Sequence, residues 1–300
     1  MPELPEVETI RLGLRSHLEG RRLEDLEVFS ARAVRRVSDL ADLLSLAGRR
    51  IDEVARRGKF LWLVLDGAPR ALVLHLGMSG QLLVHAEPPS DLPRHTAVVL
   101  HLDRGTVLFV DQRTFGHLDA VPLVPTPDGR PGGAGTTRPV MPATVAHIGR
   151  DPLDPSLDLP AVAGRMHRTT SAVKRVLLDQ RYVSGIGNIY ADETLWHARV
   201  HPERPAATLS VGELEGLVRT AGEVMAEAVR VGGTSFDALY VDTMGQAGYF
   251  ARQLRAYGRT GQPCGRCGTL IERHVIGGRS SHLCPRCQRS MRVPSPITDN

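Results

Sequence analysis

The four cysteines of this 300-residue chain all lie near its C-terminus, in two pairs with the pattern C-x2-C-x16-C-x2-C. Such pairs are typical of a structural zinc site, where four thiolates complete a tetrahedron and leave no position for a catalytic water. Two disulfides are the alternative, but thiols stay reduced in a cytosolic chain. We therefore expect one structural Zn²⁺, held by Cys264, Cys267, Cys284 and Cys287.

The segment between the cysteine pairs carries turn and charge signals of a nucleic-acid-binding finger. Two short β-like runs flank Gly277 and Gly278, which predicts a hairpin with Arg279 just after its turn. His274 and His282 are interpreted as hairpin side chains, because four cysteines already suffice for the metal. Residues 252–292 contain nine arginines and one acid, which indicates a polyanion-binding surface, although a solvated basic face has the same composition.

A glycine-rich stretch, VSGIGNIYADE (residues 183–193), could contact phosphate. It is a poor dinucleotide-binding motif, because Tyr190 stands at the third glycine position and a predicted helix precedes it. A tight turn between two helices fits better, with Gly185 and Gly187 allowing close backbone approach. Asn188 could then bind a phosphate together with free N–H groups at the next helix start. The alternative is an ordinary Asn helix cap.

The remaining elements must hold these groups in place. A helix is predicted over residues 5–18, with Pro5 in its first turn and an apolar stripe from Val7 to Leu18. Seven β-like runs follow (23–30, 50–58, 59–67, 70–77, 81–86, 96–102 and 106–113), which indicates a sandwich or barrel. A Pro/Gly-rich segment (124–142) is expected to be a flexible surface loop. Residues 149–160 resemble a linker, and helical periodicity extends from 159 to 239.

We therefore expect a multidomain α+β protein. Its parts are an N-terminal antiparallel β-sandwich domain with an N-terminal helix (1–150), a helical domain (151–251), a zinc finger (252–292) and a tail (293–300). There is no apolar run of 18 residues and no secretory signal, so we expect a cytoplasmic protein without membrane contact. The aromatic content of 4% argues against a stacking platform for single strands, so duplex DNA is the expected partner of a monomer.

Six motifs in register give the chain a resemblance to the formamidopyrimidine-DNA glycosylases of bacteria, a family that includes endonuclease VIII. These are MPELPEVET, RRGKFL, LHLGMSGQL, DQRTFG, VSGIGNIYADE and the four-cysteine finger, which together cover nearly the whole chain. The resemblance implies that the helical domain is a helix-two-turns-helix domain. It also implies base excision repair by a bifunctional glycosylase/AP lyase acting on damaged double-stranded DNA.

The resemblance also gives the N-terminus a chemical role. Removal of Met1 would expose the secondary amine of Pro2, and an α-amine with a pKa near 8 is on the order of a fifth neutral at cytosolic pH. Pro2 would attack the sugar C1′, expel the base and form a Schiff base that promotes β,δ-elimination. Glu3 is similar to the family's general acid/base. Glu6 matches a carboxylate near the damaged base, although favourable helix-dipole charge also explains it.

Further residues match the family's DNA contacts. Only two of the 37 basic residues are lysines. Lys59 matches the strand lysine beside the lesion phosphate, whereas Lys174 is interpreted as an exposed helix residue. Side chains that fill the gap left by a flipped base match Met78, Arg113 and Phe115. Gln112 stands where the family often has proline, which puts the stiffness of that loop in doubt. The resemblance further implies DNA contacts for His95 and Asn188, and a catalytic phosphate contact for Arg279.

Residues 232–261 resemble the longer loop with which purine-specific members cover 8-oxoguanine. We therefore expect oxidised purines, 8-oxoguanine and formamidopyrimidines, as substrates. An endonuclease VIII-like glycosylase for oxidised pyrimidines is the alternative. A catalytically silent DNA-binding relative is another, although Pro2, Glu3 and Lys59 are all present. The place of action is expected to be the bacterial cytoplasm, with the protein associated with the nucleoid while it acts on DNA.

Overall fold

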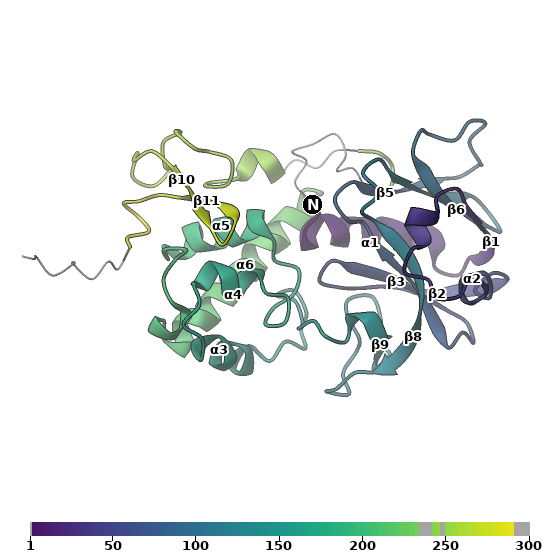
Figure 1. Ribbon diagram of the computed structural model, residues 1–300, viewed down its shortest axis with the longest axis horizontal. Coiled ribbons are helices and arrows are strands. Elements are labelled where there is room, and N and C mark those ends of the chain that lie inside the picture. The colour runs from purple at the N-terminus through teal and green to yellow at the C-terminus, as the bar shows by residue number, and fades with distance from the viewer. Residues whose placement is uncertain (1, 234–241, 247–249, 291–300) are drawn as a thin grey trace, which may run out of the picture. The chain divides into compact units, whose positions relative to one another are not determined.

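Figure 1 shows the computed structural model, which describes residues 2–233, 242–246 and 250–290. The chain divides into two compact units. The first comprises Met1–Leu157 and Met225–Gln253, and the second comprises Asp158–Val224 and Leu254–Asn300. The boundaries expected at residues 150, 251 and 292 remain a proposal. None of the described helices is long and apolar enough to cross a membrane.

The first unit consists of an N-terminal helix and nine antiparallel strands. The strands hydrogen-bond in the order β5-β7-β6-β1-β2-β3-β4-β8-β9. Only two residue pairs join β1 to β2, and side chains from both halves of the sheet meet in one core that includes α1, which confirms the sandwich. The elements are α1 (Leu4–Leu18), β1 (Arg22–Val28), η1 (Ala31–Val34), α2 (Leu40–Leu44), β2 (Arg49–Arg57), β3 (Phe60–Leu65), β4 (Arg70–His75), β5 (Gly80–His85), β6 (Thr96–Leu102), β7 (Thr106–Asp111), β8 (His117–Pro125), β9 (Val140–Pro142) and η2 (Ala143–Val145).

All seven predicted runs form strands, and α1 confirms the predicted first helix. Strands β8 and β9 were not predicted. Pro122 and Pro125 interrupt β8, and a proline within a run argues against a strand from sequence alone. Pairing with β4 on one side and β9 on the other nevertheless makes it a strand.

The Pro/Gly-rich segment is packed against β2, so the expectation of a flexible loop is wrong. Ala134 and Arg56 exchange two backbone hydrogen bonds of 2.9 Å, so the segment covers part of the edge of β2. A Cβ on Gly133 would lie 2.2 Å from the Arg56 carbonyl oxygen, and one on Gly135 would lie 2.3 Å from that of Val54. Glycine is therefore required for this close approach.

The second unit contains short helices and the finger. Its elements are α3 (Leu159–His167), α4 (Val173–Leu178), α5 (Asn188–Ala198), η3 (Ala206–Thr208), the first part of α6 (Val211–Arg230), β10 (Glu272–Ile276) and β11 (Arg279–Leu283). The rest of α6 and η4 (Phe250–Gln253) belong to the first unit. Helix α6 ends at Arg230, just before Gly232 and Gly233, which both have φ +81, and residues 234–239 of the predicted helical region lie outside the described residues.

Candidate active site and nucleic-acid interface

The N-terminus is fixed by a capping box at the start of α1. Glu3 is the N-cap, and its backbone N–H donates to the Glu6 carboxylate at 2.8 Å, while the Glu3 side chain accepts from the Glu6 backbone. Pro2, Glu3 and Glu6 are all buried. A Cβ on Gly233 would lie 3.1 Å from Glu6 Oε1, so Glu6 lies against the start of the segment 232–261. The two reciprocal hydrogen bonds between Glu3 and Glu6 therefore fix the terminus that carries Pro2 to the first turn of the helix.

Lys59 occupies the tight turn between β2 and β3, next to Gly58 with φ +56. Burial and the charges of Arg36, Lys59 and Arg35 lower the pKa of His75 to about 4. The His75 ring stacks on the His117 ring, with 5.2 Å between the ring centres. Burial, the charge of His75 and the charges of Arg36 and Arg35 lower the pKa of His117 to about 3. Neither histidine was singled out from the sequence: His75 ends the apolar run LVLH, and His117 follows Gly116 at the start of β8.

The three residues expected to fill the gap lie on two turns that touch one another. Met78 is half-buried between β4 and β5, and Phe115 is 50% exposed between β7 and β8. The Arg113 guanidinium lies 5.4 Å from the centre of the Phe115 ring. A Cβ on Gly77, whose φ is +61, would lie 2.5 Å from the Gly116 nitrogen. The two turns are therefore in backbone contact, which brings the expected residues together.

Asp111 and Arg35 hold the second of these turns. The Asp111 carboxylate accepts from the Gly116 N–H at 2.6 Å and from the Ser79 hydroxyl at 2.5 Å. The Asp111 N–H donates to the carbonyl of His95, an exposed residue with φ +69. The structure therefore places His95 beside the same turn. Arg35 was not singled out from the sequence, and it donates to the Phe115 and Gly116 carbonyls at 2.8 and 2.7 Å.

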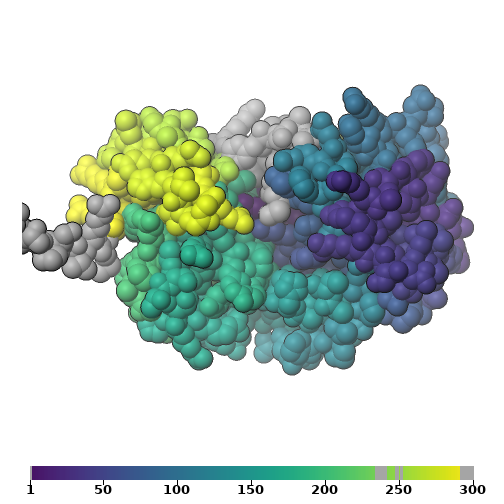
Figure 2. Space-filling view, in the orientation of Figure 1, coloured from purple at the N-terminus to yellow at the C-terminus, as the bar shows by residue number. Residues whose placement is uncertain are grey.

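In the second unit, Asn188 contacts Ser280, the residue that follows Arg279. Asn188 begins α5, so the cap position belongs to Gly187 and the simple Asn-cap alternative is wrong. Its side-chain nitrogen donates to the Ser280 carbonyl at 2.9 Å. Arg279 is exposed and follows the Gly277–Gly278 turn, whose positive φ angles confirm the predicted hairpin. The finger, yellow in Figure 2, forms part of the surface of this unit.

Lys174 is wrongly predicted as an exposed residue, because its side chain is fully buried. Its ammonium donates to Asp192 Oδ1 at 2.6 Å and to the Ser280 carbonyl at 2.7 Å. The other oxygen of Asp192 accepts from the His282 backbone N–H at 2.8 Å and contacts His282 Nδ1 at 3.0 Å. This network attaches the hairpin that carries Arg279 to α4 and α5.

The four cysteines fit one tetrahedral metal ion. Their Sγ atoms all lie within 4.8 Å of one another, and Cys267 Sγ lies 3.5 Å from those of Cys284 and Cys287. Zinc–sulfur bonds of about 2.3 Å place tetrahedral sulfurs about 3.8 Å apart, whereas a disulfide needs about 2.05 Å. Cys264 and Cys284 are buried in one apolar cluster with Trp196 of α5, and Cys267 and Cys287 are half-buried against it.

Three family models match successive parts of the chain. The formamidopyrimidine-DNA glycosylase N-terminal domain matches residues 1–118, the H2TH domain of the same enzymes matches 148–239, and the zinc finger found in FPG and IleRS matches 261–289. Together they span most of the chain in the order that the motifs predicted.

Whole proteins agree with these matches. The formamidopyrimidine-DNA glycosylase of Leifsonia xyli subsp. xyli is 50% identical over 296 residues, covering 96% of this chain and 100% of the relative. The crystal structure of the MutM (FPG) protein from Thermus thermophilus is 37% identical with a TM-score of 0.79, covering 96% of this chain and 98% of that chain. A point mutant of the Lactococcus lactis FPG, solved in complex with a Fapy-dG containing DNA, is 28% identical with a TM-score of 0.80, covering 96% and 100%. With relatives of this identity and coverage, the chain belongs to the formamidopyrimidine-DNA glycosylase family.

Proposed function

We propose that this protein is a base excision repair DNA glycosylase with AP lyase activity, and that Pro2 is its nucleophile. The observation that carries the proposal is the buried capping box, which holds Pro2 and Glu3 at the start of α1. A nucleophile at a chain terminus must be positioned against fraying, and few N-termini are enclosed in this way. Family membership supports the reaction type.

The chemistry begins once Met1 is removed and the Pro2 nitrogen is a free amine. Its lone pair attacks the sugar C1′ and the glycosidic bond breaks. The base leaves with the bonding electrons and takes up the proton that the Pro2 nitrogen loses. Glu3 protonates the ring oxygen, so that the C1′–O bond opens to an iminium. The iminium acidifies the C2′ proton, whose loss expels the 3′ phosphate, and a second elimination expels the 5′ phosphate. Water then hydrolyses the iminium, which breaks the bond between Pro2 and C1′ and regenerates the free amine. The products are a one-nucleotide gap and an unsaturated sugar aldehyde.

The remaining site residues would bind and distort the DNA. Lys59 and Arg279 would contact phosphates near the lesion, and Arg279 would assist elimination by stabilising the leaving phosphate. From the second unit Asn188 adds a phosphate contact, and His95 adds a contact in the first. Met78, Arg113 and Phe115 would fill the space of the flipped nucleotide, with Arg113 facing the orphaned base. Glu6 would lie near the damaged base.

The four cysteines would hold one Zn²⁺, which fixes the fold of the finger and takes no part in the reaction. The protein is proposed to act as a monomer on damaged duplex DNA in the bacterial cytoplasm, associated with the nucleoid. The domain limits of 150, 251 and 292 belong to this proposal.

We favour oxidised purines as substrates because of the long segment 232–261. Residues 234–241 and 247–249 of that segment lie outside the described residues, so the preference rests on the resemblance. Oxidised pyrimidines are the second candidate. The wild-type Lactococcus lactis relative was solved with an oxidized pyrimidine containing DNA, which favours keeping this candidate.

Borohydride trapping on an 8-oxoguanine duplex tests the mechanism. Wild-type protein should form a covalent adduct, and Pro2→Gly should reduce the trapping rate because a less nucleophilic primary amine replaces the secondary ring amine. Glu3→Gln should bind the duplex and incise it poorly. An adduct that survives Pro2→Gly unchanged contradicts the assignment. Faster incision at dihydrouracil than at 8-oxoguanine contradicts the purine preference.

A further inference from the structure

We propose that Arg56, with Glu8 and Asp151, is a positioning residue that fixes the turn of Lys59 to the helix carrying Pro2 and Glu3. The inference rests on the proposed function, since it assigns Arg56 an effect on turnover through Lys59. All of these residues belong to the first unit.

Arg56 is 1% exposed and makes contacts in two directions. Its Nε donates to Glu8 Oε2 at 2.7 Å, and its Nη1 donates to Asp151 Oδ2 at 2.8 Å. The same Nη1 donates to the Gly58 carbonyl at 3.1 Å. One buried guanidinium therefore joins a helix, the end of β2 and the segment that follows η2.

The Glu8 end of this network is rigid. Glu8 follows Glu6 on α1, and its carboxylate also accepts from Arg11 Nε and Nη2 at 3.0 and 2.7 Å. Burial alone would raise the pKa of Glu8, but hydrogen bonds and charges from Arg11 and Arg56 lower it. The carboxylate therefore stays ionised and holds Arg56 against the first two turns of α1.

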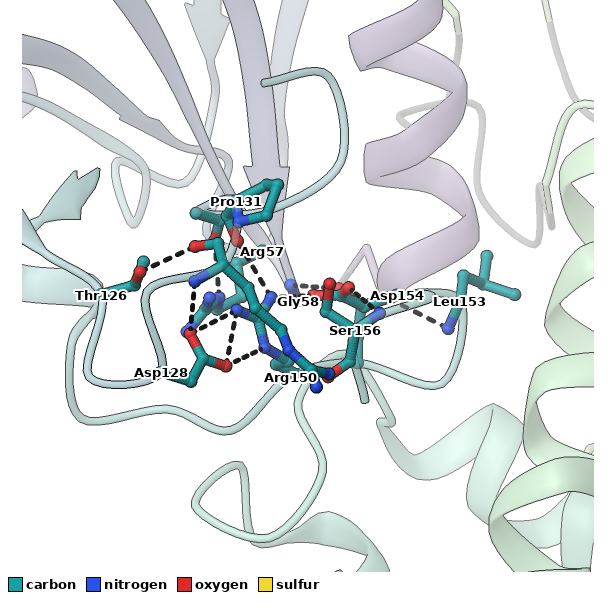
Figure 3. Close-up of polar contacts among 12 residues, drawn as sticks. Arg57, Gly58, Thr126, Asp128, Pro131, Arg150, Leu153, Asp154 and Ser156 are labelled. Carbon is teal, nitrogen blue, oxygen red and sulfur yellow. Dashed lines mark hydrogen bonds and ion pairs between the residues drawn. The ribbon is translucent and has the colours of Figure 1, made fainter. Parts of the chain in front are cut away.

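The Asp151 end holds the turn from the other side. Asp151 Oδ2 accepts from the Gly58 N–H at 3.1 Å, so both polar groups of the Gly58 backbone are bound by this network. Gly58 has φ +56, and its conformation determines the direction in which the next residue, Lys59, leaves the strand. Figure 3 shows Gly58 beside Arg57, whose Nε donates to the Gly132 carbonyl at 2.8 Å.

Stability alone does not explain such a network. The cations of Arg11 and Arg56 are buried together with the anions of Glu8 and Asp151. Replacing such buried ion pairs with apolar side chains often leaves the free energy of unfolding unchanged or raises it. Geometry gives a better reason, because a displacement of about 1 Å in a catalytic group can cost roughly 10²-fold in rate. Phosphate contact by Lys59 and attack by Pro2 must occur on one nucleotide, so their relative position matters.

The test is a double-mutant cycle of single-turnover incision on an 8-oxoguanine duplex. Asp151→Asn is the main variant, because the amide keeps an acceptor for Gly58 and removes the charge that orients Arg56. Arg56→Met is the stronger second variant. Asp154→Asn is the matched control. Asp154 lies in the same segment and pairs with Arg150 at 2.6 Å, and among the described residues it makes no hydrogen bond or ion pair with Gly58.

Asp151→Asn should lower the incision rate about 10-fold in the wild-type background and less than about 2-fold in the Lys59→Ala background. Asp154→Asn should stay within about 2-fold of wild type in both backgrounds. Equal losses in the two backgrounds, or an equal loss in Asp154→Asn, would overturn the inference. Wild-type protein that forms no borohydride adduct would refute the proposed function and the inference together, whereas an adduct with additive losses refutes only the inference.

Discussion

Replacing Lys174 with methionine should destabilise the second unit strongly. The Lys174 ammonium is fully buried and bound to Asp192 and to the Ser280 carbonyl. Methionine fills nearly the same volume, so cavity formation contributes little. The main effect is that Asp192, 1% exposed, is left as a buried anion without its cation.

The magnitude follows from the donors that remain. Removing one partner of a buried ion pair typically costs about 3–5 kcal/mol. Asp192 keeps the Ser281 hydroxyl at 3.2 Å and two donors of His282, so we expect the lower end, about 3 kcal/mol. At roughly 2–4 °C per kcal/mol, the melting temperature should fall by roughly 6–12 °C.

Calorimetry of the zinc-loaded protein measures this loss, and hydrogen exchange locates it. Amides of β10 and β11 should exchange faster in Lys174→Met, while those of β3 and β4 should not. Asp192→Asn in the Lys174→Met background is the control, because it removes the unpaired charge and should recover part of the stability. A loss below about 1 kcal/mol, or a double variant as unstable as the sum of the singles, would refute the reasoning.

Three further predictions concern other parts of the molecule. Chelation of zinc, or Cys267→Ala, should unfold the hairpin and weaken duplex binding. The chemical step, measured by borohydride trapping on abasic DNA, should not depend on the metal. Duplex binding that is unchanged after chelation would contradict a structural ion. Gly77→Ala should impair incision, because its Cβ would lie 2.5 Å from the Gly116 nitrogen. Gly20→Ala is the control: Gly20 has φ +83 and a Cβ there would meet no atom within 4 Å, so this change should cost only about 1–2 kcal/mol of stability. Because the pKa of His75 is lowered to about 4 in the folded state, the folded protein favours the neutral imidazole, whereas the unfolded chain takes up a proton near pH 6.5. The contribution of His75 to the free energy of unfolding should therefore be complete above about pH 6.5 and be lost as the pH falls toward 4. Melting temperatures of wild type and His75→Gln should therefore converge over that range, and curves that stay parallel would exclude the effect.

Local patterns predicted much of the fold. Alternation and turn residues located seven strands, and Pro5 with the apolar stripe located α1. Gly277 and Gly278 predicted the hairpin because a two-residue turn needs positive φ at both positions. The sequence did not predict that segment 124–142 has a defined conformation, because that conformation depends on backbone hydrogen bonds with β2, some 80 residues away in the chain.

The sequence by itself determined which chemical groups the protein has and the order in which they occur: four thiolates in a metal-binding pattern, Pro2 next to Glu3, and the motifs that carry Lys59 and Arg113. Those signals are local, since spacing along the chain defines them. Tertiary structure alone decided that Lys174 is buried and that Arg56 joins Glu8 to Asp151, 48 and 95 residues away. Burial and ion pairing at such separations depend on packing, because the same charged side chain would be solvated if no partner surface covered it.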